Sequence, residues 1–426
     1  MKRRRILSVH PMKQKNENRE EFFTALDVGS SKVLCLVARP GAEPGSLRVI
    51  GMGDAPSHGI RHGCVVDVQE AVQSIRSALR EAGYTANVQL TGVWAAIGGQ
   101  TLRSANCVGQ TVLRGREVTR DDVEQAESNA RQAAQREVQA EGGEFLKMIP
   151  QGFRCGDVTV ERPIGLSGQR LEAFVHALYG SRSNARNLKR CIERAGVELI
   201  DYEPHPWAAA KAVLTDTERQ CGAALIDIGA QTTSLIVFRE GRVRFTDVRP
   251  WGADYLTRDI AMVLGISLEQ AEALKLRSGE CRASMVNPGE IVELETRGEL
   301  SRPYSRELLV KTLAARVREL FELYRRILAD AGALGEIELV TLTGGGAMLP
   351  GLAESASAIL GRRVRIGCPR LIEGETPLLS RPDAVVAAGL ARCALERSVS
   401  GAERAYGARR ARTFGDRLKT FFIGDY

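Results

Sequence analysis

The sequence has no apolar run long enough to span a membrane and no closely spaced pair of cysteines. Its 9 cysteines stand singly, without the C-x-x-C spacing of zinc or redox sites, so we expect buried thiols in a reducing compartment. The Arg-rich start is not followed by an apolar segment with a cleavage site, which argues against a secretory leader. No RNA-binding aromatic motif accompanies the basic clusters, which argues against nucleic acid as a partner. These absences predict a cytoplasmic protein.

The composition that remains is that of a globular protein. The chain has 426 residues, of which 44% are hydrophobic, and this leaves room for two to four domains. The net charge of +7 is concentrated at the ends, in Lys2–Arg5 and between Arg404 and Lys419. Basic ends of this kind can meet an anionic membrane.

Two stretches that lie 200 positions apart share one pattern. Ala224–Phe238 reads as a strand ending in Asp-x-Gly, a small polar tip and a returning strand, and Ala25–Val37 repeats it. Each copy is followed by a short β run and a helical pattern. Similarity on this scale predicts two related halves that face each other across a cleft.

The polar tips of the two hairpins are suited to phosphate. Glycine lets the backbone approach a bulky anion, and successive N–H groups with nearby hydroxyls can cradle it. Asp27 and Asp227 end the first strand of each hairpin, and they need a hydrated Mg²⁺ between themselves and a phosphate. For either stretch alone, an ordinary turn would explain the pattern equally well. The tip residues predicted to hold phosphate are Gly29, Ser30, Ser31, Lys32, Gly229, Thr232 and Thr233.

A third stretch, Glu338–Leu352, reads as a buried strand, a run of three glycines and a helix with Pro350 near its first turn. The glycines at 344–346 let the backbone lie flat against a ligand, and a helix N-terminus favours negative charge. A plain tight turn is the alternative interpretation.

In this order, the three stretches resemble the two phosphate loops and the adenosine loop of the actin, Hsp70 and sugar-kinase superfamily. Within it, the chain resembles the FtsA family of bacterial cell-division proteins from about Phe22 to Tyr426. The motifs that carry this resemblance are Ser57–Gly63, Ile149–Gln151, Arg162–Glu172, Leu256–Ala261 and Gln270–Lys275. The resemblance implies an α/β, actin-like (ribonuclease H-like) duplicated two-domain fold, with an inserted small α/β subdomain and a C-terminal amphipathic helix.

The domain boundaries that we expect follow from this comparison. The predicted units are a disordered basic tail at 1–21, a first half at 22–87 that continues at 180–203 and 377–396, an insert at 88–179, a second half at 204–376 with an outer subdomain around 245–330, a linker at 397–411 and a membrane-targeting helix at 412–426. We expect Gly83 to end the helix before the insert. Thr119 and Asp122 predict a capping box at the start of the insert's helix, which runs to about Ala140.

The ligands implied by the resemblance are ATP and Mg²⁺. Glu272 and Lys275, three residues apart on one helix, would contact the nucleoside, although a surface ion pair is the alternative. The other implied nucleotide contacts are Gly252, Gly344, Gly345, Gly346 and Met348.

The chain departs from the family pattern at several of its candidate site positions. The family usually has Gly-Gly and a later acidic residue where this chain has Ala230, Gln231 and Ser234, a second Gly at Ala253 and an apolar residue at His205. We therefore assign no catalytic residue and expect at most weak ATPase activity.

The partners are also implied by the resemblance. Arg302 and Arg306 lie where the family binds the acidic tail of the tubulin-like protein FtsZ, although solvated charges are the alternative. The inserted subdomain would serve filament contacts and meet other division proteins.

The last residues form an amphipathic pattern. Phe414, Leu418, Phe421 and Phe422 share one helical stripe flanked by Arg417 and Lys419, which predicts a helix lying in a membrane interface. Docking onto the chain's own domain is the alternative. Four such side chains contribute at most ~6–12 kcal/mol before ordering costs, so one copy is a reversible anchor and a filament holds firmly through many copies.

Together these features predict an actin-like ATP-binding protein that polymerises on the inner membrane face at the division site. It would be a peripheral membrane protein of the Z ring that tethers FtsZ filaments to anionic lipid and recruits later division proteins. The alternatives are a phosphotransferase of the sugar-kinase branch and a pilus-assembly actin-like ATP-binding protein.

Overall fold

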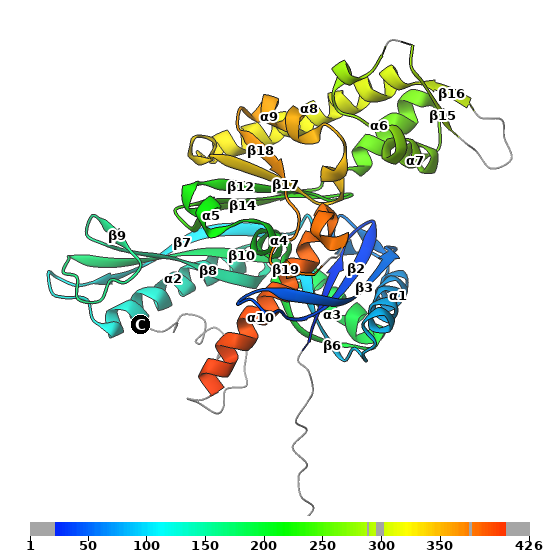
Figure 1. Cartoon of the computed structure of the whole chain (residues 1–426). Helices are drawn as coiled ribbons and strands as arrows, with labels where there is room; N and C mark the ends of the chain where they lie inside the picture. The colour runs from blue at the N-terminus through cyan, green and yellow to red at the C-terminus, as the bar shows by residue number, and fades with distance from the viewer. Residues whose placement is uncertain (1–21, 288, 295–301, 375–376, 406–426) are drawn as a thin grey trace, which may run out of the picture.

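The computed structural model describes residues 22–287, 289–294, 302–374 and 377–405. It has two α/β halves, each built on a mixed sheet, with a further small sheet at one side (Figure 1). The strand order is β11-β6-β1-β2-β3-β19 in the first half, β14-β13-β12-β17-β18 in the second half and β7-β10-β8-β9 in the insert. The predicted α/β actin-like fold with an inserted subdomain is confirmed.

The elements of the first half and the insert are bounded as follows. The first half contains β1 (Phe23–Val28), β2 (Lys32–Pro40), β3 (Leu47–Pro56), β4 (Ile60–Arg61), β5 (Cys64–Val65), α1 (Val68–Ala86), β6 (Gly92–Ile97), α3 (Arg182–Ala195), β11 (Glu198–Pro204) and β19 (Ile372–Glu373). The insert contains β7 (Arg103–Val112), α2 (Arg120–Ala140), β8 (Gly143–Cys155), β9 (Val158–Val160) and β10 (Arg170–Ser181).

The second half and the connecting helices complete the fold. The second half contains α5 (Asp216–Cys221), β12 (Ala223–Ile228), β13 (Thr233–Arg239), β14 (Arg242–Arg249), α8 (Arg306–Asp330), β17 (Leu339–Thr343), α9 (Leu352–Leu360) and β18 (Arg363–Ile366). Its outer part adds α6 (Asp254–Leu264), α7 (Leu268–Ser278), β15 (Ile291–Leu294) and β16 (Arg302–Ser305). Two helices, α4 (His205–Val213) and α10 (Val385–Ala405), lie between the halves. Short 3-10 turns are η1 (Ala283–Met285), η2 (Leu334–Glu336), η3 (Gly345–Met348), η4 (Pro377–Ser380) and η5 (Pro382–Ala384).

The two predicted hairpins have the same geometry. β1 pairs antiparallel with β2 and β12 with β13, so that Asp27 lies opposite Leu34 and Asp227 opposite Ser234. At each tip, the glycine N–H donates to the carbonyl three residues on, at 3.0 Å for Gly29 and 2.9 Å for Gly229. The repeat seen in the sequence is therefore a structural repeat.

Four of the expected boundaries are wrong. β19 pairs in parallel with β3, so Ile372–Glu373 belong to the first sheet and the predicted end of the second half at residue 376 is too late. β6 pairs in parallel with β1 and β11, so it belongs to the first sheet and the predicted start of the insert at residue 88 is too early. α1 continues past Gly83 to Ala86, because Asn87 takes the left-handed cap at φ 53°. α10 continues to Ala405, into the predicted linker, because this segment is rich in Ala, Glu and Arg, which favour helix. The capping box of Thr119 and Asp122 is confirmed.

The joint between the halves is built from the small residues of α4 and α10. Their buried alanines belong to one core cluster that also takes in Ala25 and Leu36 of the first sheet and Leu225 and Ile236 of the second. Gly389 lies directly against the backbone of Ala208, so that a Cβ at 389 would overlap the Ala208 carbonyl oxygen. The two Ala- and Gly-rich helices therefore cross in close contact.

Replacing Gly389 with alanine is expected to force α4 and α10 apart and to lower the free energy of unfolding by about 1–3 kcal/mol. Urea denaturation followed by circular dichroism measures this. Gly335→Ala is the matched control, because no atom lies near a Cβ at that position. Equal unfolding midpoints for the two variants would contradict the close contact.

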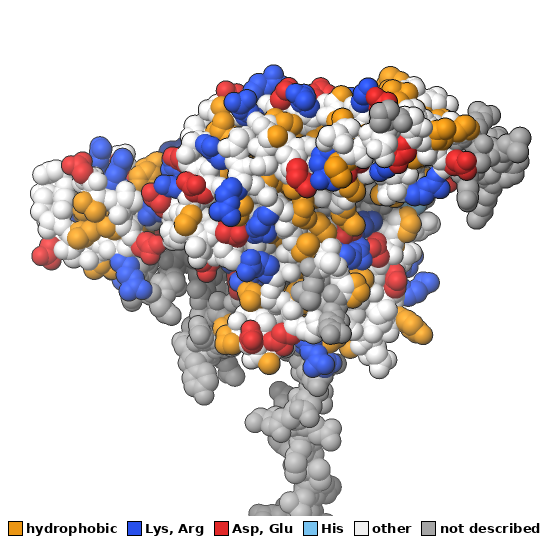
Figure 2. All heavy atoms as spheres, turned by 45° about the horizontal axis from the view of Figure 1, so that its top comes forward, with side chains coloured by type: hydrophobic (Ala, Val, Ile, Leu, Met, Phe, Trp, Pro, Cys, Tyr) orange, Lys and Arg blue, Asp and Glu red, His pale blue; other side chains and the backbone are white. Residues whose placement is uncertain are grey.

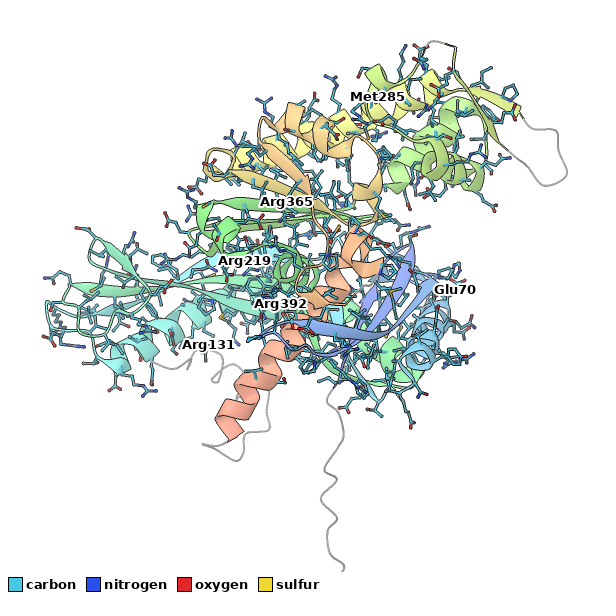
Figure 3. All side chains as sticks on the ribbon, in the orientation of Figure 1. Glu70, Arg131, Arg219, Met285, Arg365 and Arg392 are labelled. Carbon is cyan, nitrogen blue, oxygen red and sulfur yellow. The ribbon has the colours of Figure 1, made fainter. Side chains whose placement is uncertain are left out.

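Three arginines secure the C-terminal end of α4 (Figure 3). Arg392 of α10 donates to the Lys211 carbonyl, Arg219 of α5 donates to the carbonyls of Ala210 and Leu214, and Arg365 of β18 donates to that of Val213. The last carbonyls of a helix lack partners within it, and guanidinium groups satisfy them here. The end of α4 is thus tied to α10 and to the second half.

The face shown in Figure 2 carries charged side chains of both signs, scattered over the two halves and the insert, which projects at the left. Among the described helices, none is both long and apolar enough to cross a membrane.

Candidate functional site

A cavity of about 720 Å³ lies between the two hairpin tips, the glycine turn after β17, and helices α6 and α7. It is where the structure places most of the predicted ligand residues. Those that line it are Asp27, Gly29, Ser30, Ser31, Lys32, Asp227, Gly229, Thr232, Glu272, Lys275, Gly344, Gly345, Gly346 and Met348. Residues from both halves therefore face one space.

Two predicted residues do not line this cavity. Thr233 is fully buried at the start of β13, and its hydroxyl donates to the carbonyl of Trp251 at 2.7 Å. Gly252 packs on the second tip, where a Cβ would overlap the Ala230 carbonyl oxygen. Both residues stabilise the tip from within the protein. The Thr233 hydroxyl is already hydrogen-bonded to the Trp251 carbonyl, and Gly252, having no side chain, lets its backbone pack against Ala230.

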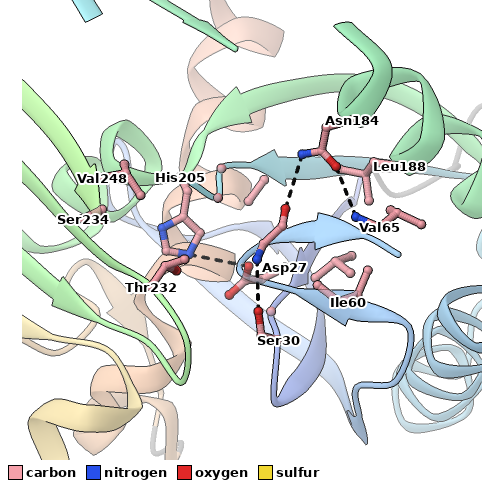
Figure 4. A pocket seen from close by; sticks show the side chains of 16 residues that line it. Asp27, Ser30, Ile60, Val65, Asn184, Leu188, His205, Thr232, Ser234 and Val248 are labelled. Atoms are coloured by element: carbon pink, nitrogen blue, oxygen red, sulfur yellow. Dashed lines mark hydrogen bonds and ion pairs between the residues drawn. The ribbon is translucent and has the colours of Figure 1, made fainter. Parts of the chain in front are cut away.

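The two aspartates approach each other across the cleft with His205 between them. Figure 4 shows His205 beside Asp27. The imidazole Nε2 lies 3.8 Å from Oδ1 of Asp27, and Nδ1 lies 3.4 Å from Oδ2 of Asp227. Within the described residues, Oδ2 of Asp227 is buried and has no hydrogen-bond partner. Asp27 also lines a small cavity of about 50 Å³, into which Asn184 and Ile60 face.

Burial determines the electrostatics of this pair. Desolvation raises the pKa of Asp27 and of Asp227, because a carboxylate is poorly solvated inside the protein, while the neighbouring His205 acts in the opposite direction. A buried carboxylate with an unsatisfied oxygen is costly without a cation or a donor. The arrangement can therefore accept a hydrated divalent cation, which the prediction for these two residues requires.

Lys32 is held by acidic residues at the mouth of the first tip. Its Nζ donates to Asp383, which precedes α10, and lies 3.8 Å from Oδ2 of Asp54. Arg381 contacts the same two carboxylates. Although burial alone would raise the pKa of Asp383, hydrogen bonds from Arg381 and Lys32 hold it at about 2. A phosphate at this tip would have to compete with Asp383 for Lys32.

The glycine turn after β17 fits closely against the second hairpin. Gly344 has φ +85°, and a Cβ there would overlap both Oδ1 of Asp227 and the Ile228 carbonyl oxygen. A Cβ on Gly346 would overlap the Ile228 side chain. Only glycine fits at 344, because the backbone is left-handed and Asp227 occupies the space.

Glu272 and Lys275 form a partly buried pair rather than a surface one. Nζ of Lys275, which is 7% exposed, lies 2.7 Å from Oε2 of Glu272 and donates to the Thr257 hydroxyl at 2.8 Å. Thr257 in turn donates to Glu272. The three polar groups form a network on α6 and α7 at the cavity wall.

Several polar residues of the cavity had no role in the sequence prediction: His205, Gln231, Asp254 and Asp383. His205 stood out only as a departure from the family pattern. Gln231 accepts a hydrogen bond from the His62 N–H at 2.9 Å and so joins the two halves. No local pattern in the sequence indicates these contacts, because each joins residues far apart in the chain.

The other predicted sites lie away from this cavity. Arg302 is in β16, and Arg306 begins α8 and donates to the Glu290 carboxylate. The predicted membrane residues Phe414, Arg417, Leu418, Lys419, Phe421 and Phe422 lie outside the described residues.

Two family models match this chain. Residues 224–389 match the model of cell division protein FtsA, and residues 99–179 match the SHS2 domain inserted in FtsA. The second match covers the four-stranded insert and begins after β6. This agrees with the pairing of β6 with β1, which places β6 in the first sheet rather than in the insert.

Curated relatives agree over most of the chain. The sequence is 33% identical over 387 residues to the cell division protein FtsA of Pseudomonas aeruginosa, covering 89% of this chain and 91% of that protein. It is 32% identical over 386 residues to the FtsA of Neisseria meningitidis, covering 89% and 92%.

Solved structures show the same fold at low sequence identity. A PilM-PilN type IV pilus biogenesis complex matches with TM-score 0.64 and 18% identity, covering 87% of this chain and 97% of the other. MreB 5 of Spiroplasma citri bound to AMPPNP matches with TM-score 0.53 and 14% identity, covering 90% and 100%.

Proposed function

The chain belongs to the FtsA family of bacterial cell-division proteins, and from that premise we propose that it binds Mg-ATP between its two halves and polymerises on the inner membrane face, where it tethers FtsZ filaments. The observation that carries the nucleotide part is the meeting of two matching hairpin tips at one cavity that also contains a glycine turn. The MreB 5 structure of the same fold holds AMPPNP.

The cavity residues fit this ligand. The unsatisfied Oδ2 of Asp227, with Asp27 across the cleft, suits Mg²⁺ held through water. The backbone N–H groups and hydroxyls of Ser30, Ser31 and Thr232 suit the phosphates. Gly344 to Gly346 carry no side chains that would block a nucleoside, and they line the cavity together with Glu272 and Lys275.

Hydrolysis is not part of this proposal. The family's acidic residue after the threonines is Ser234 here, and a hydroxyl is a much weaker general base than a carboxylate. Bound Mg²⁺ neutralises phosphate charge, and the chain's own residues bind and orient the nucleotide.

We propose that residues 412–426 attach the chain to the membrane and that self-association increases the overall membrane affinity. One short amphipathic helix binds reversibly, whereas a filament presents many copies on one surface and gains avidity without any new contact. The inserted subdomain, which projects from the body, is proposed to meet further copies or other division proteins.

One co-pelleting experiment tests these proposals together. The full chain is mixed with anionic vesicles, with and without Mg-ATP, in the presence of a labelled peptide from the FtsZ tail. We expect protein and peptide to pellet with the vesicles, and ATP to increase the pelleted fraction. Protein that stays in the supernatant would overturn the membrane proposal, while ATP turnover that depends on an added sugar would favour a kinase instead.

Arg306 is expected to contribute to binding of the acidic FtsZ tail. Because Arg306 is paired with Glu290 in this structure, an acidic peptide competes with that carboxylate. Replacing Arg306 with alanine is expected to weaken peptide binding by about threefold to tenfold, and Glu290→Gln to strengthen it by up to a similar factor. Fluorescence anisotropy measures both, and opposite shifts distinguish this role from a loss of folding. Unchanged affinity in both variants would place the tail elsewhere.

A further inference from the structure

A second pocket, of about 380 Å³, lies where the inserted sheet meets the second half. Its floor comes from α2, β8 and β10, and its opposite wall comes from the end of α5 and the turn between β13 and β14. In Figure 1 these elements lie at the left, with the insert beneath α5 and β14. This pocket is separate from the cavity between the hairpin tips and shares no residue with it.

The strand ladder is interrupted at the pocket. β8 and β10 pair at Pro150 with Val175 and again at Phe153 with Ala173, so two residues of β8 lie opposite one of β10. The extra residues are Gln151 and Gly152, which has φ +82°, and both line the pocket. β-Bulges of this kind redirect side chains and are common beside binding sites.

Two buried polar side chains lie at the floor. Glu127 on α2 is only 8% exposed and lines the pocket, and its nearest attractive charge is that of Arg131, one turn along the same helix. Gln151 is also 8% exposed, and its Oε1 has no hydrogen-bond partner among the described residues, while its Nε2 donates to the Ile149 carbonyl. Buried acceptors left in this state are costly unless a donor reaches them.

The charges around the pocket decide which donor fits. Glu127, Glu161 and Glu240 line it from three separate segments, whereas Arg242, which lies over Gly152, is the one basic residue among the described residues that line the pocket. An anion would meet three carboxylates. A cation that donates several hydrogen bonds would satisfy the floor and neutralise the walls. Burial raises the pKa of Glu127 to about 7, because desolvation of the carboxylate outweighs the opposing effect of the Arg131 charge.

We propose that this pocket binds a protonated amine, with Glu127 as its ion-pair partner and Gln151 as a second acceptor. The amine can belong to a free polyamine or to a lysine side chain of another protein, since both present the same ammonium group. The pocket's position between the insert and the second half means that the occupant would contact both.

Isothermal titration of the full chain at pH 8 tests this, with spermidine and Nα-acetyl-lysine methylamide as separate probes. We expect saturable one-site binding of at least one probe, weakened by roughly tenfold to a hundredfold in Glu127→Gln. Glu137→Gln is the matched control, because Glu137 is an exposed residue of the same helix outside the pocket. Spermidine binding indicates a free polyamine, and binding of the lysine probe alone indicates a partner's side chain.

The proposal is overturned if neither probe saturates, or if the two glutamine variants change binding equally. Neither titration uses nucleotide or lipid, so a negative result for the amine site leaves the proposed function unaffected.

The same variant tests the state of Glu127 by a different measurement. Because its folded pKa lies above the usual 4.5, wild-type stability is lost as pH rises toward and through about 7. The groups that face or neighbour it are Glu124, Arg131, Glu161, Glu240 and Arg242. Glu127→Gln is expected to match wild type near pH 5 and to melt higher at pH 8. Melting curves at four pH values measure this, and a difference that does not vary with pH would show that Glu127 is not desolvated.

Discussion

Asp227→Asn is expected to weaken Mg-dependent ATP binding by about 10–100-fold while making the nucleotide-free chain more stable. The amide keeps the shape of the side chain but cannot attract a hydrated cation. It also removes a buried charge whose Oδ2 has no hydrogen-bond partner within the described part of the chain. We expect a gain on the order of 1 kcal/mol in the free energy of unfolding, partly offset by the lost contact with His205.

Binding of a fluorescent ATP analogue, with Mg²⁺ and with EDTA, measures the first effect, and urea denaturation measures the second. Asp157→Asn is the control, because it makes the same change in an exposed turn of the insert. A variant that binds ATP more weakly but unfolds less easily indicates a residue that serves ligand binding at a cost in stability. A variant that loses stability, or that binds ATP equally well with and without Mg²⁺, would contradict the assignment of Asp227.

Removing residues 412–426 is expected to release the chain from anionic vesicles almost completely. A sharper variant is Phe421→Asp with Phe422→Asp, because two large apolar side chains contribute ~3–6 kcal/mol to burial in the interface. That corresponds to a loss of at least about a hundredfold in membrane partitioning. Vesicle co-sedimentation measures both variants.

Thr420→Ala is the matched control, since it changes the same segment off the apolar stripe. Binding should also weaken as salt rises, because Arg417 and Lys419 each contribute about 1 kcal/mol on an anionic leaflet. If the truncated chain still sediments with vesicles, another surface must carry the attachment.

The two hairpins and the glycine turn could be predicted because each is a local pattern. A strand, Asp-x-Gly and a returning strand determine a tip within fifteen residues, and the repetition at Asp27 and Asp227 indicates that the tips belong together. The capping box at Thr119 is local in the same sense. These patterns could not indicate which polar side chains are already hydrogen-bonded inside the protein. Thr233, for example, donates its hydroxyl to the Trp251 carbonyl instead of facing the cavity.

The missed features depend on contacts between distant parts of the chain. Lys32 meets Asp383 across most of the sequence, and His205 lies between two carboxylates that are 200 positions apart. β6 reads like any short strand, and only its pairing with β1 assigns it to the first sheet. Gly83 was expected to end a helix, but packing overrides the weak propensity of one glycine.

The length of α10 has a mechanical consequence. The helix crosses α4 at Gly389, in the joint between the two halves, and continues without a break to Ala405, about 24 Å farther on at 1.5 Å per residue. If a helix segment of this length tilted by about 10° at the crossing, its far end would move by roughly 4 Å. Any closing of the cleft around a ligand would thereby be amplified at the point from which the final residues depart.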